Sequence, residues 1–180
     1  MHEKRFEGDI DRLRNPERIA RLEVDKVVNL CLNGIHVKSV LDVGTGTGLF
    51  AEAFAKRGLV VTGVDVNPRM VSTAHEYVPN GNFLEACAEE LPFNNSSFDI
   101  VFMGLLLHES DEQLKVLNEA RRIAGKQASI LEWAYRQEEF GPPKEDRLSV
   151  KVLETLAEKA GFHKFEVIPL SKLIYYRLSN

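Results

Sequence analysis

The sequence lacks the features that mark several classes of protein. It contains only two cysteines in 180 residues, Cys31 and Cys87, and neither belongs to a CxxC pair or has a histidine at metal-ligand spacing. A disulfide framework and a zinc site are therefore not indicated, and we expect both thiols to be reduced. No segment reaches the ~18 apolar residues of a membrane span, and the start, MHEKRFEGD, lacks the apolar core of a signal peptide. These absences predict a cytoplasmic protein without a metal ion or membrane contact.

Positive charge is not in excess either. The formal net charge is -4 and the pI is near 5.8, which gives no electrostatic footprint for nucleic acid. The basic residues between 4 and 21 alternate with acidic ones, a pattern typical of a solvated helix face. With 44% hydrophobic and 28% charged residues, the chain has the composition of one ordinary globular domain. We therefore expect a small-molecule partner and no nucleic acid.

A glycine-rich turn between two carboxylates is the most informative feature of the chain. The segment LDVGTGTG places Gly44, Gly46 and Gly48 directly after an apolar run, with Asp42 two residues before the first glycine. Glycine permits positive φ angles and leaves no side chain in the way, so a ligand can lie against bare backbone. A second apolar run ends at Asp65, roughly 20 residues further on. The spacing predicts a binding turn, with a tight strand-to-helix turn that binds nothing as the alternative.

The charge of Asp42 favours one kind of ligand over another. A dinucleotide places its anionic pyrophosphate at such a turn, and a carboxylate beside it would repel those phosphates. S-adenosylmethionine carries a sulfonium and an ammonium group and no phosphate, so the same carboxylate attracts it. Asp65 is placed to accept hydrogen bonds from ribose hydroxyls, a role common to both ligand types. The pair of carboxylates predicts S-adenosylmethionine as the cofactor.

Strands and helices alternate along the chain. Predicted strands cover residues 37–43, 60–65, 82–86, 98–103, 127–133, 163–168 and 173–178. Predicted helices cover residues 15–34, 49–57, 67–77, 110–123 and 149–160. The first and third helices open on an Asn-Pro pair, and Ser110 with Gln113 forms an S-x-x-Q capping box for the fourth.

This alternation predicts a three-layer α/β fold with a doubly wound, mostly parallel seven-stranded sheet. Only about three or four residues separate the last two strands, so they must form an antiparallel hairpin at the C-terminus. In such sheets ligands bind beyond the carboxyl ends of the strands. The site is therefore expected at the tips that carry Asp42, Asp65, Met103 and Glu132.

Several motifs together point to a family. The segments LDVGTGTG, VDVNPRM, AEELPF and FDIVFMGLLLH, followed by the terminal hairpin, resemble the class I S-adenosylmethionine-dependent methyltransferases over residues 37–178. The likeness is closest to the small-molecule branch that includes ubiquinone and menaquinone C-methyltransferases. It implies a Rossmann-like methyltransferase fold and S-adenosylmethionine as cofactor.

The resemblance also implies positions for the cofactor-binding residues. The methionine end would lie against Asp42 and the turn of Gly44, Thr45, Gly46 and Gly48, with Met103 and Gly104 touching it mainly through backbone. Asp65 would bind the ribose, and Val66 and Met70 would flank the adenine.

One position departs from the family pattern. Members often have an acid followed by alanine before the LPF segment, where it meets the adenine amino group, and here that acid is replaced by Cys87. Either Glu89 substitutes for it, or the backbone of Ala88 suffices.

Two side chains are candidates for the transfer chemistry. Methyl transfer from a sulfonium needs a general base only if the acceptor must lose a proton. His108 follows the fourth strand, on the rim where an acceptor approaches, and is the candidate base; a histidine that caps or packs is the alternative. Glu132, at the end of the fifth strand, must be paired or face the cleft. Trp133 beside it forms either an apolar wall or part of the core.

The N-terminal region is expected to differ from the rest of the chain. Residues 1–36 form a helical segment, and residues 37–180 form a single S-adenosylmethionine-binding core. Phe6, Arg12 and Arg14 lie in the first part, where they form either a lid over the cofactor or a solvated tail.

The sequence therefore predicts S-adenosylmethionine-dependent methyl transfer to a small molecule. Two alternatives stay open: a non-catalytic S-adenosylmethionine-binding module that serves a partner protein, and a NAD-dependent dehydrogenase. Because no dedicated cap is present, the acceptor pocket is left to the N-terminal helix and to residues 104–111 and 134–148. This favours a small or flat acceptor, or a site completed by the second subunit of a homodimer.

Overall fold

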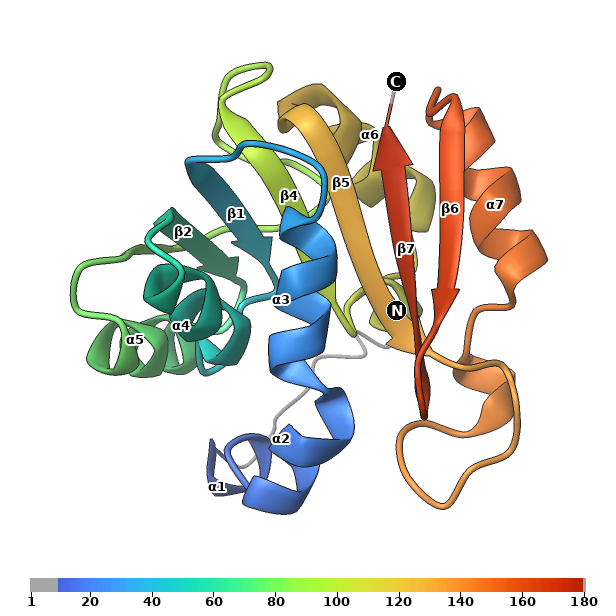
Figure 1. Cartoon of the computed structure of the whole chain (residues 1–180), viewed down its shortest axis with the longest axis horizontal. Helices are drawn as coiled ribbons and strands as arrows, with labels where there is room; N and C mark the ends of the chain where they lie inside the picture. The colour runs from blue at the N-terminus through green and yellow to red at the C-terminus, as the bar shows by residue number, and fades with distance from the viewer. Residues whose placement is uncertain (1–9, 180) are drawn as a thin grey trace.

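A seven-stranded sheet forms the centre of the computed structural model, which describes residues 10–179 (Figure 1). The strands are β1 (Ser39–Val43), β2 (Val60–Asp65), β3 (Asn82–Glu85), β4 (Phe98–Gly104), β5 (Ala124–Trp133), β6 (Lys164–Pro169) and β7 (Leu173–Ser179). Their order is β3-β2-β1-β4-β5-β7-β6, and only the pairings of β7 with β5 and β6 are antiparallel. The predicted doubly wound sheet with a C-terminal hairpin is confirmed.

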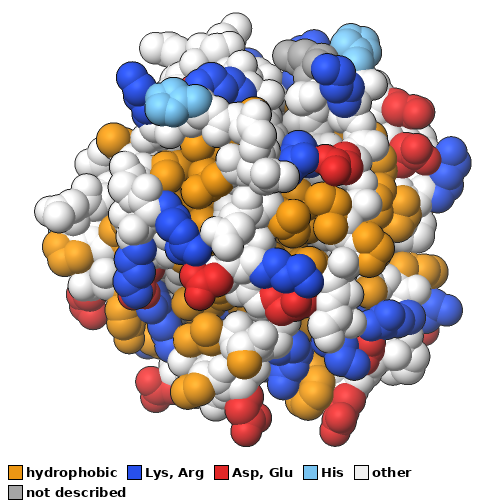
Figure 2. Space-filling model, in the orientation of Figure 1, with side chains coloured by type: hydrophobic (Ala, Val, Ile, Leu, Met, Phe, Trp, Pro, Cys, Tyr) orange, Lys and Arg blue, Asp and Glu red, His pale blue; other side chains and the backbone are white. Residues whose placement is uncertain are grey.

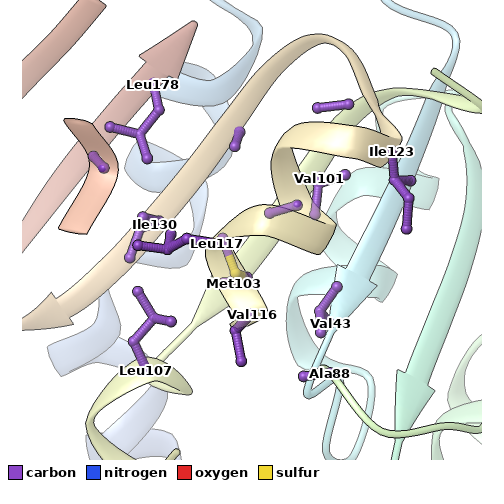
Figure 3. Packing of buried hydrophobic residues seen from close by; sticks show 14 of the residues in the cluster. Val43, Ala88, Val101, Met103, Leu107, Val116, Leu117, Ile123, Ile130 and Leu178 are labelled. Atoms are coloured by element: carbon purple, nitrogen blue, oxygen red, sulfur yellow. The ribbon is translucent and has the colours of Figure 1, made fainter. Parts of the chain in front are cut away.

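Helices cover both faces of the sheet. They are α1 (Ile10–Leu13), α2 (Pro16–Leu22), α3 (Val24–Leu32), α4 (Leu49–Lys56), α5 (Pro68–Tyr77), α6 (Gln113–Ile123) and α7 (Val150–Lys159), with short 3-10 turns η1 (Leu107–Glu109) and η2 (Lys144–Asp146). On one face α3 and α4 bury Val28 and Phe54 against Phe102 of β4. On the other, α6 buries Leu117 against the sheet (Figure 3), and α7 buries Leu153 in the same cluster. Apolar residues at helical spacing thus fold against strands that are apolar on both faces.

The predicted helix from residue 15 to residue 34 is wrong in one respect. It is divided at Glu23, which adopts a left-handed conformation with φ 48°, so α2 ends at Leu22 and α3 begins at Val24. The carboxylate of Glu23 accepts a hydrogen bond from the backbone N–H of Ser171 at 2.9 Å. Left-handed backbone is unfavourable for a non-glycine residue, and this contact to the β6–β7 hairpin helps to hold it.

The capping prediction for α6 is also wrong. Instead of bonding the helix, Ser110 donates to Glu89 at 2.7 Å and accepts from the N–H of Glu112 at 3.1 Å. The helix begins at Gln113, whose side chain bonds the carbonyl of Leu107. The turn η1 ends at Glu109, and residues 110–112, where the first helical turn was expected, are not helical.

Three further observations concern the surroundings and the surface of the sheet. In Figure 1, α1 and α2 lie beyond the carboxyl ends of β1 and β5, on the same side as the loop that follows β5. Figure 2 shows acidic and basic side chains interspersed with hydrophobic ones over the face in view, without dominance of one sign. Among residues 10–179, no helix has the length and apolar character needed to cross a bilayer.

Candidate functional site

The turn after β1 has the backbone geometry that its glycines predict. The φ angles of Gly44, Gly46 and Gly48 are +70°, +53° and +75°, in the region that glycine occupies without strain. A Cβ atom on Gly44 would lie 2.9 Å from the side chain of Leu106. The N–H of Thr45 donates to the carbonyl of Val64 at 2.9 Å, so the turn is held against β2.

Asp65 at the tip of β2 is fixed by two backbone amides. Its Oδ2 accepts from the N–H of Gly46 and its Oδ1 from the N–H of Asn67, each at 2.9 Å. Burial raises the pKa of its carboxyl, while these hydrogen bonds oppose the shift. The carboxylate therefore has one orientation, toward the turn, and spare lone pairs for hydroxyl donors.

Asp42 lies beneath the same turn and is 2% exposed. Its Oδ2 accepts a hydrogen bond of 2.7 Å from the hydroxyl of Thr45. Burial raises the pKa of Asp42 to about 7, and the negative charge of Asp65 acts in the same direction. Near neutral pH this carboxyl is poised between its two forms, and a cation placed beside it would favour the ionised one.

These groups open into a cavity of about 1030 Å³ at the carboxyl ends of the strands. The expected site residues that line it are Asp42, Gly44, Thr45, Gly46, Asp65, Val66, Met70, Cys87, Ala88, Glu89, Gly104 and His108. Three expected residues do not line it: Gly48, Met103 and Glu132.

The three exceptions have structural positions of their own. A Cβ atom on Gly48 would lie 3.0 Å from Cα of Ala74, so this glycine allows α4 and α5 to approach each other. Met103 is fully buried in the core, close to Val116 and Leu117 of α6 (Figure 3). Glu132 is 1% exposed and lies behind the cavity wall, where it contacts His108.

His108 and Glu132 form a hydrogen-bonded pair. Nδ1 of His108 lies 2.8 Å from Oε2 of Glu132, and the backbone N–H of His108 donates to Oε1 at 3.2 Å. Because a carboxylate only accepts, Nδ1 carries the proton in this contact and Nε2 of a neutral ring is the basic atom. Nε2 lies 3.7 Å from Oε1 of Glu109, another residue of the cavity wall.

Glu89 also lines the cavity. One of its carboxylate oxygens accepts from Ser110 Oγ at 2.7 Å, and the other accepts from the thiol of Cys87 at 2.7 Å. Burial and the neighbouring Glu89 raise the pKa of the Cys87 thiol. The thiol is therefore a hydrogen-bond donor to Glu89 here and is not activated as a nucleophile.

The N-terminal helices are tied to the glycine turn by Arg14. Its Nη2 donates to the carbonyl of Thr47 at 2.6 Å and its Nη1 to Glu52 at 2.5 Å, while the guanidinium stacks on Tyr77 at 3.5 Å. Arg12 lines the cavity. The expectation for Phe6 falls outside the described residues.

A loop between β5 and α7 closes another side of the cavity. Trp133 lines the wall and packs on Gly141, where a Cβ atom would lie 2.7 Å from the indole. Arg147 is buried and donates to the carbonyls of Pro142, Phe140 and Ala134. The indole of Trp133 thus lines the cavity and also packs against the loop. The two alternatives for this residue, an apolar wall and a packed core residue, therefore both apply.

Sequence reasoning missed several lining residues. Leu13, Arg18 and Leu22 come from α1 and α2, and Leu105 comes from the segment after β4. No motif marks the first three. Leu105 has a positive φ of 60°, a conformation that costs energy for a non-glycine residue and is typical of functional sites, but it is invisible in sequence.

Comparison with known proteins identifies the domain. A family model described as a methyltransferase domain matches residues 41–131, just over half of the chain. The chain belongs to this methyltransferase family. The matched range includes the glycine turn, Asp65 and His108. The predicted family resemblance is therefore confirmed.

Two curated relatives of this methyltransferase domain carry names that refer to quinones. The chain is 38% identical over 93 residues to the demethylmenaquinone methyltransferase of Chlorobaculum tepidum, which covers 51% of this chain and 38% of that protein. It is 37% identical over 116 residues to the ubiquinone biosynthesis O-methyltransferase of Coxiella burnetii, which covers 62% of this chain and 47% of that protein. The match thus spans less than half the length of each relative.

A solved structure extends the likeness over almost the whole chain. A S-adenosylmethionine-dependent methyltransferase from Aquifex aeolicus superposes with a TM-score of 0.83 at 27% identity, and the match covers 94% of this chain and 95% of the other. The methyltransferase fold, including the terminal hairpin, is therefore shared.

Proposed function

We propose that this chain is a S-adenosylmethionine-dependent methyltransferase that acts on a small-molecule acceptor. Membership of the methyltransferase family supports this proposal. The observation that carries it is the placement of Asp42 and Asp65 around a bare glycine turn in one large cavity. A methyl donor and a small acceptor together need a cavity of this order.

The residues of the turn fit S-adenosylmethionine better than a dinucleotide. Asp42 puts negative charge where a pyrophosphate would lie, and this buried carboxyl is unfavourable in its ionised form unless a cation compensates it. The ammonium and sulfonium groups of S-adenosylmethionine supply that cation. This charge pattern disfavours a NAD-dependent dehydrogenase.

Each half of the cofactor has a matching set of side chains. Asp42 and the turn from Gly44 to Gly46 would hold the methionine end, and Asp65 would accept from the ribose hydroxyls. Val66 and Met70 line the cavity beside Asp65 and would flank the adenine. At the adenine edge, Glu89 already accepts from Cys87 and Ser110, which favours the backbone of Ala88 as the contact for the amino group.

His108 is the proposed general base, and Glu132 is its positioning residue. When bound, the cofactor supplies a methyl group on a good leaving group. The protein then has to orient the acceptor, exclude water and remove a proton from the acceptor where one must leave. With Nδ1 held by Glu132, Nε2 of His108 is oriented to accept that proton.

The N-terminal segment is the proposed lid of the site. α1 and α2 contribute Arg12, Leu13 and Leu22 to the cavity wall, and Arg14 ties the segment to the glycine turn. We propose that residues 1–36 act in this way on a single core of residues 37–180. A homodimer that completes the acceptor side stays a prediction.

A turnover assay tests the proposed activity. Purified protein with labelled S-adenosylmethionine is screened against phenols, thiols, amines and quinone precursors, since the curated relatives are named for quinone biosynthesis. Transfer to any of these that is lost in Asp65→Ala supports an enzyme. Binding of S-adenosylhomocysteine without turnover on any acceptor class would favour a non-catalytic binding module instead.

A further inference from the structure

We propose that the acceptor carries an anionic group, a carboxylate or a phosphate, that binds to the guanidinium of Arg18. This rests on the proposed function, because it assigns the acceptor half of the same cavity. Arg18 belongs to α2, is partly buried and lines the cavity.

The guanidinium of Arg18 has donors to spare. Within residues 10–179, its hydrogen bonding consists of one contact, from Nη1 to the carbonyl of Leu13 at 3.0 Å. None of the ion pairs formed in this part of the chain includes Arg18. A guanidinium has five N–H donors, and a planar pair of them matches a carboxylate or phosphate. A partly buried cation without an acidic partner is unfavourable until an anion binds it.

Neighbouring arginines strengthen the positive potential at this point. The charges of Arg12 and Arg21 both lower the pKa of Arg18, as burial does, so the three guanidinium groups lie within electrostatic range of each other. Arg21 stacks on the ring of Phe140 at 3.5 Å, which joins α2 to the loop after β5. Two further guanidinium groups thus lie near that of Arg18.

The cavity wall therefore carries charged groups of both signs. The carboxylate of Asp42 suits a cationic donor, whereas Arg18 suits an anionic acceptor. Glu109 influences both Arg18 and His108 electrostatically, yet it forms no ion pair with Arg18 and instead lies 3.7 Å from Nε2 of His108. Arg18 and the proposed base, His108, therefore line the same cavity, so an acceptor bound at Arg18 lies in the cavity that contains the base.

Matched probes test this assignment. Benzoate, phenyl phosphate and the neutral benzamide share one ring and differ in charge, and their affinities are measured by NMR titration with and without saturating S-adenosylhomocysteine. The variants are Arg18→Gln and, as a control, Arg57→Gln, which removes the same charge outside the cavity, where Arg57 contacts Asp25 and Asn29. Arg18→Lys keeps the positive charge but loses the planar pair of N–H donors. This variant replaces Arg18→Gln in the test if Arg18→Gln does not fold.

The expected result is that the wild-type protein binds at least one of the two anions about tenfold more tightly than benzamide, as for a charge-assisted pair of hydrogen bonds. Arg18→Gln removes this preference, Arg18→Lys weakens it, and Arg57→Gln retains it. The anion that binds more tightly tells whether a carboxylate or a phosphate is recognised. Equal affinity for anions and benzamide, or a preference that survives in Arg18→Gln, would overturn the proposal. Failure of S-adenosylhomocysteine to bind would count against the proposed function alone, because the titrations without it still report on Arg18.

Discussion

Nδ1 of His108 lies 2.8 Å from a carboxylate oxygen of Glu132, a side chain that is 1% exposed. The same carboxylate also accepts from the backbone N–H groups of His108 and Trp133. The end of β5 and the turn after β4 are thereby joined at the wall of the cavity. Glu132 has no contact with the cavity itself, so its influence on catalysis must pass through the orientation and charge of the imidazole.

Substitutions in this pair test the proposed base. We expect His108→Gln to lower kcat by about 10² to 10⁴, the usual contribution of general acid-base catalysis. Glu132→Gln leaves a partner for Nδ1 but no negative charge, so we expect a smaller loss and a shift of the acidic limb in the pH profile of kcat. A structural role alone would lower the amount of folded enzyme without moving the pH profile, and that outcome would contradict the assignment.

The pKa of Asp42 leads to a pH prediction for binding. Because burial raises this pKa to about 7, the carboxyl is largely protonated at pH 6, and a bound cation must displace that proton. We expect the affinity for S-adenosylhomocysteine to increase with pH, by up to tenfold for each unit below about 7, and to level off above it. Calorimetry in buffers of different ionisation enthalpy should detect proton release. A pH-independent affinity would show that Asp42 is not coupled to the ligand.

The raised pKa of Asp42 also affects stability. Ligand affinity is expected to increase with pH, whereas the contribution of Asp42 to the free energy of unfolding decreases. The folded protein holds a proton on Asp42 between pH 3.8 and about 7 that the unfolded chain has lost, so the contribution of Asp42 to the free energy of unfolding declines over this range as pH rises. Asp42→Asn removes this dependence and should stabilise the protein at neutral pH, by about 4 kcal/mol at most. Denaturant unfolding at pH 5 and pH 8 measures the difference between the two proteins. An equal effect of the substitution at both pH values would contradict the shift.

Gly48 offers a matched test of packing between α4 and α5. Gly48 and Gly34 both have positive φ, +75° and +79°, so alanine causes similar backbone strain at each. Only at Gly48 does the new Cβ atom meet a neighbour, Cα of Ala74 at 3.0 Å, whereas nothing lies within 4 Å at Gly34. We expect Gly48→Ala to lower the free energy of unfolding by about 1–3 kcal/mol more than Gly34→Ala does. Equal losses of stability in the two variants would show that α5 moves away from the new Cβ atom without a cost in free energy.

Arg14 provides a test of the lid. Arg14→Ala removes the hydrogen bonds to Thr47 and Glu52, and we expect it to speed proteolysis within α1 and α2 and to raise the dissociation rate of S-adenosylhomocysteine. Arg57→Ala removes an exposed arginine contact outside the cavity and serves as the control. If both variants release the ligand at the wild-type rate, α1 and α2 do not retain it.

The sheet was predictable because its signals are local and repeated. The central strands β1, β2 and β4 are largely apolar runs, and the short connection near Ser171 permits only a hairpin. The division of the N-terminal helix at Glu23 was not predictable, because the stabilising contact joins residues 148 positions apart. The site shows the same contrast. Asp42 and Asp65 are marked by the glycine turn, whereas Arg18 lines the cavity only because α2 lies beyond the carboxyl ends of the strands.

Calorimetric titration with S-adenosylhomocysteine measures whether the glycine turn and its two carboxylates bind the cofactor. The wild-type protein is expected to bind with micromolar affinity. Asp65→Ala removes the carboxylate that accepts from Gly46 and Asn67, so it should weaken binding by about 10 to 100-fold. Asp25→Ala, which removes an exposed carboxylate outside the cavity, should bind as the wild type does. Absence of binding to the wild-type protein at millimolar ligand would contradict the account.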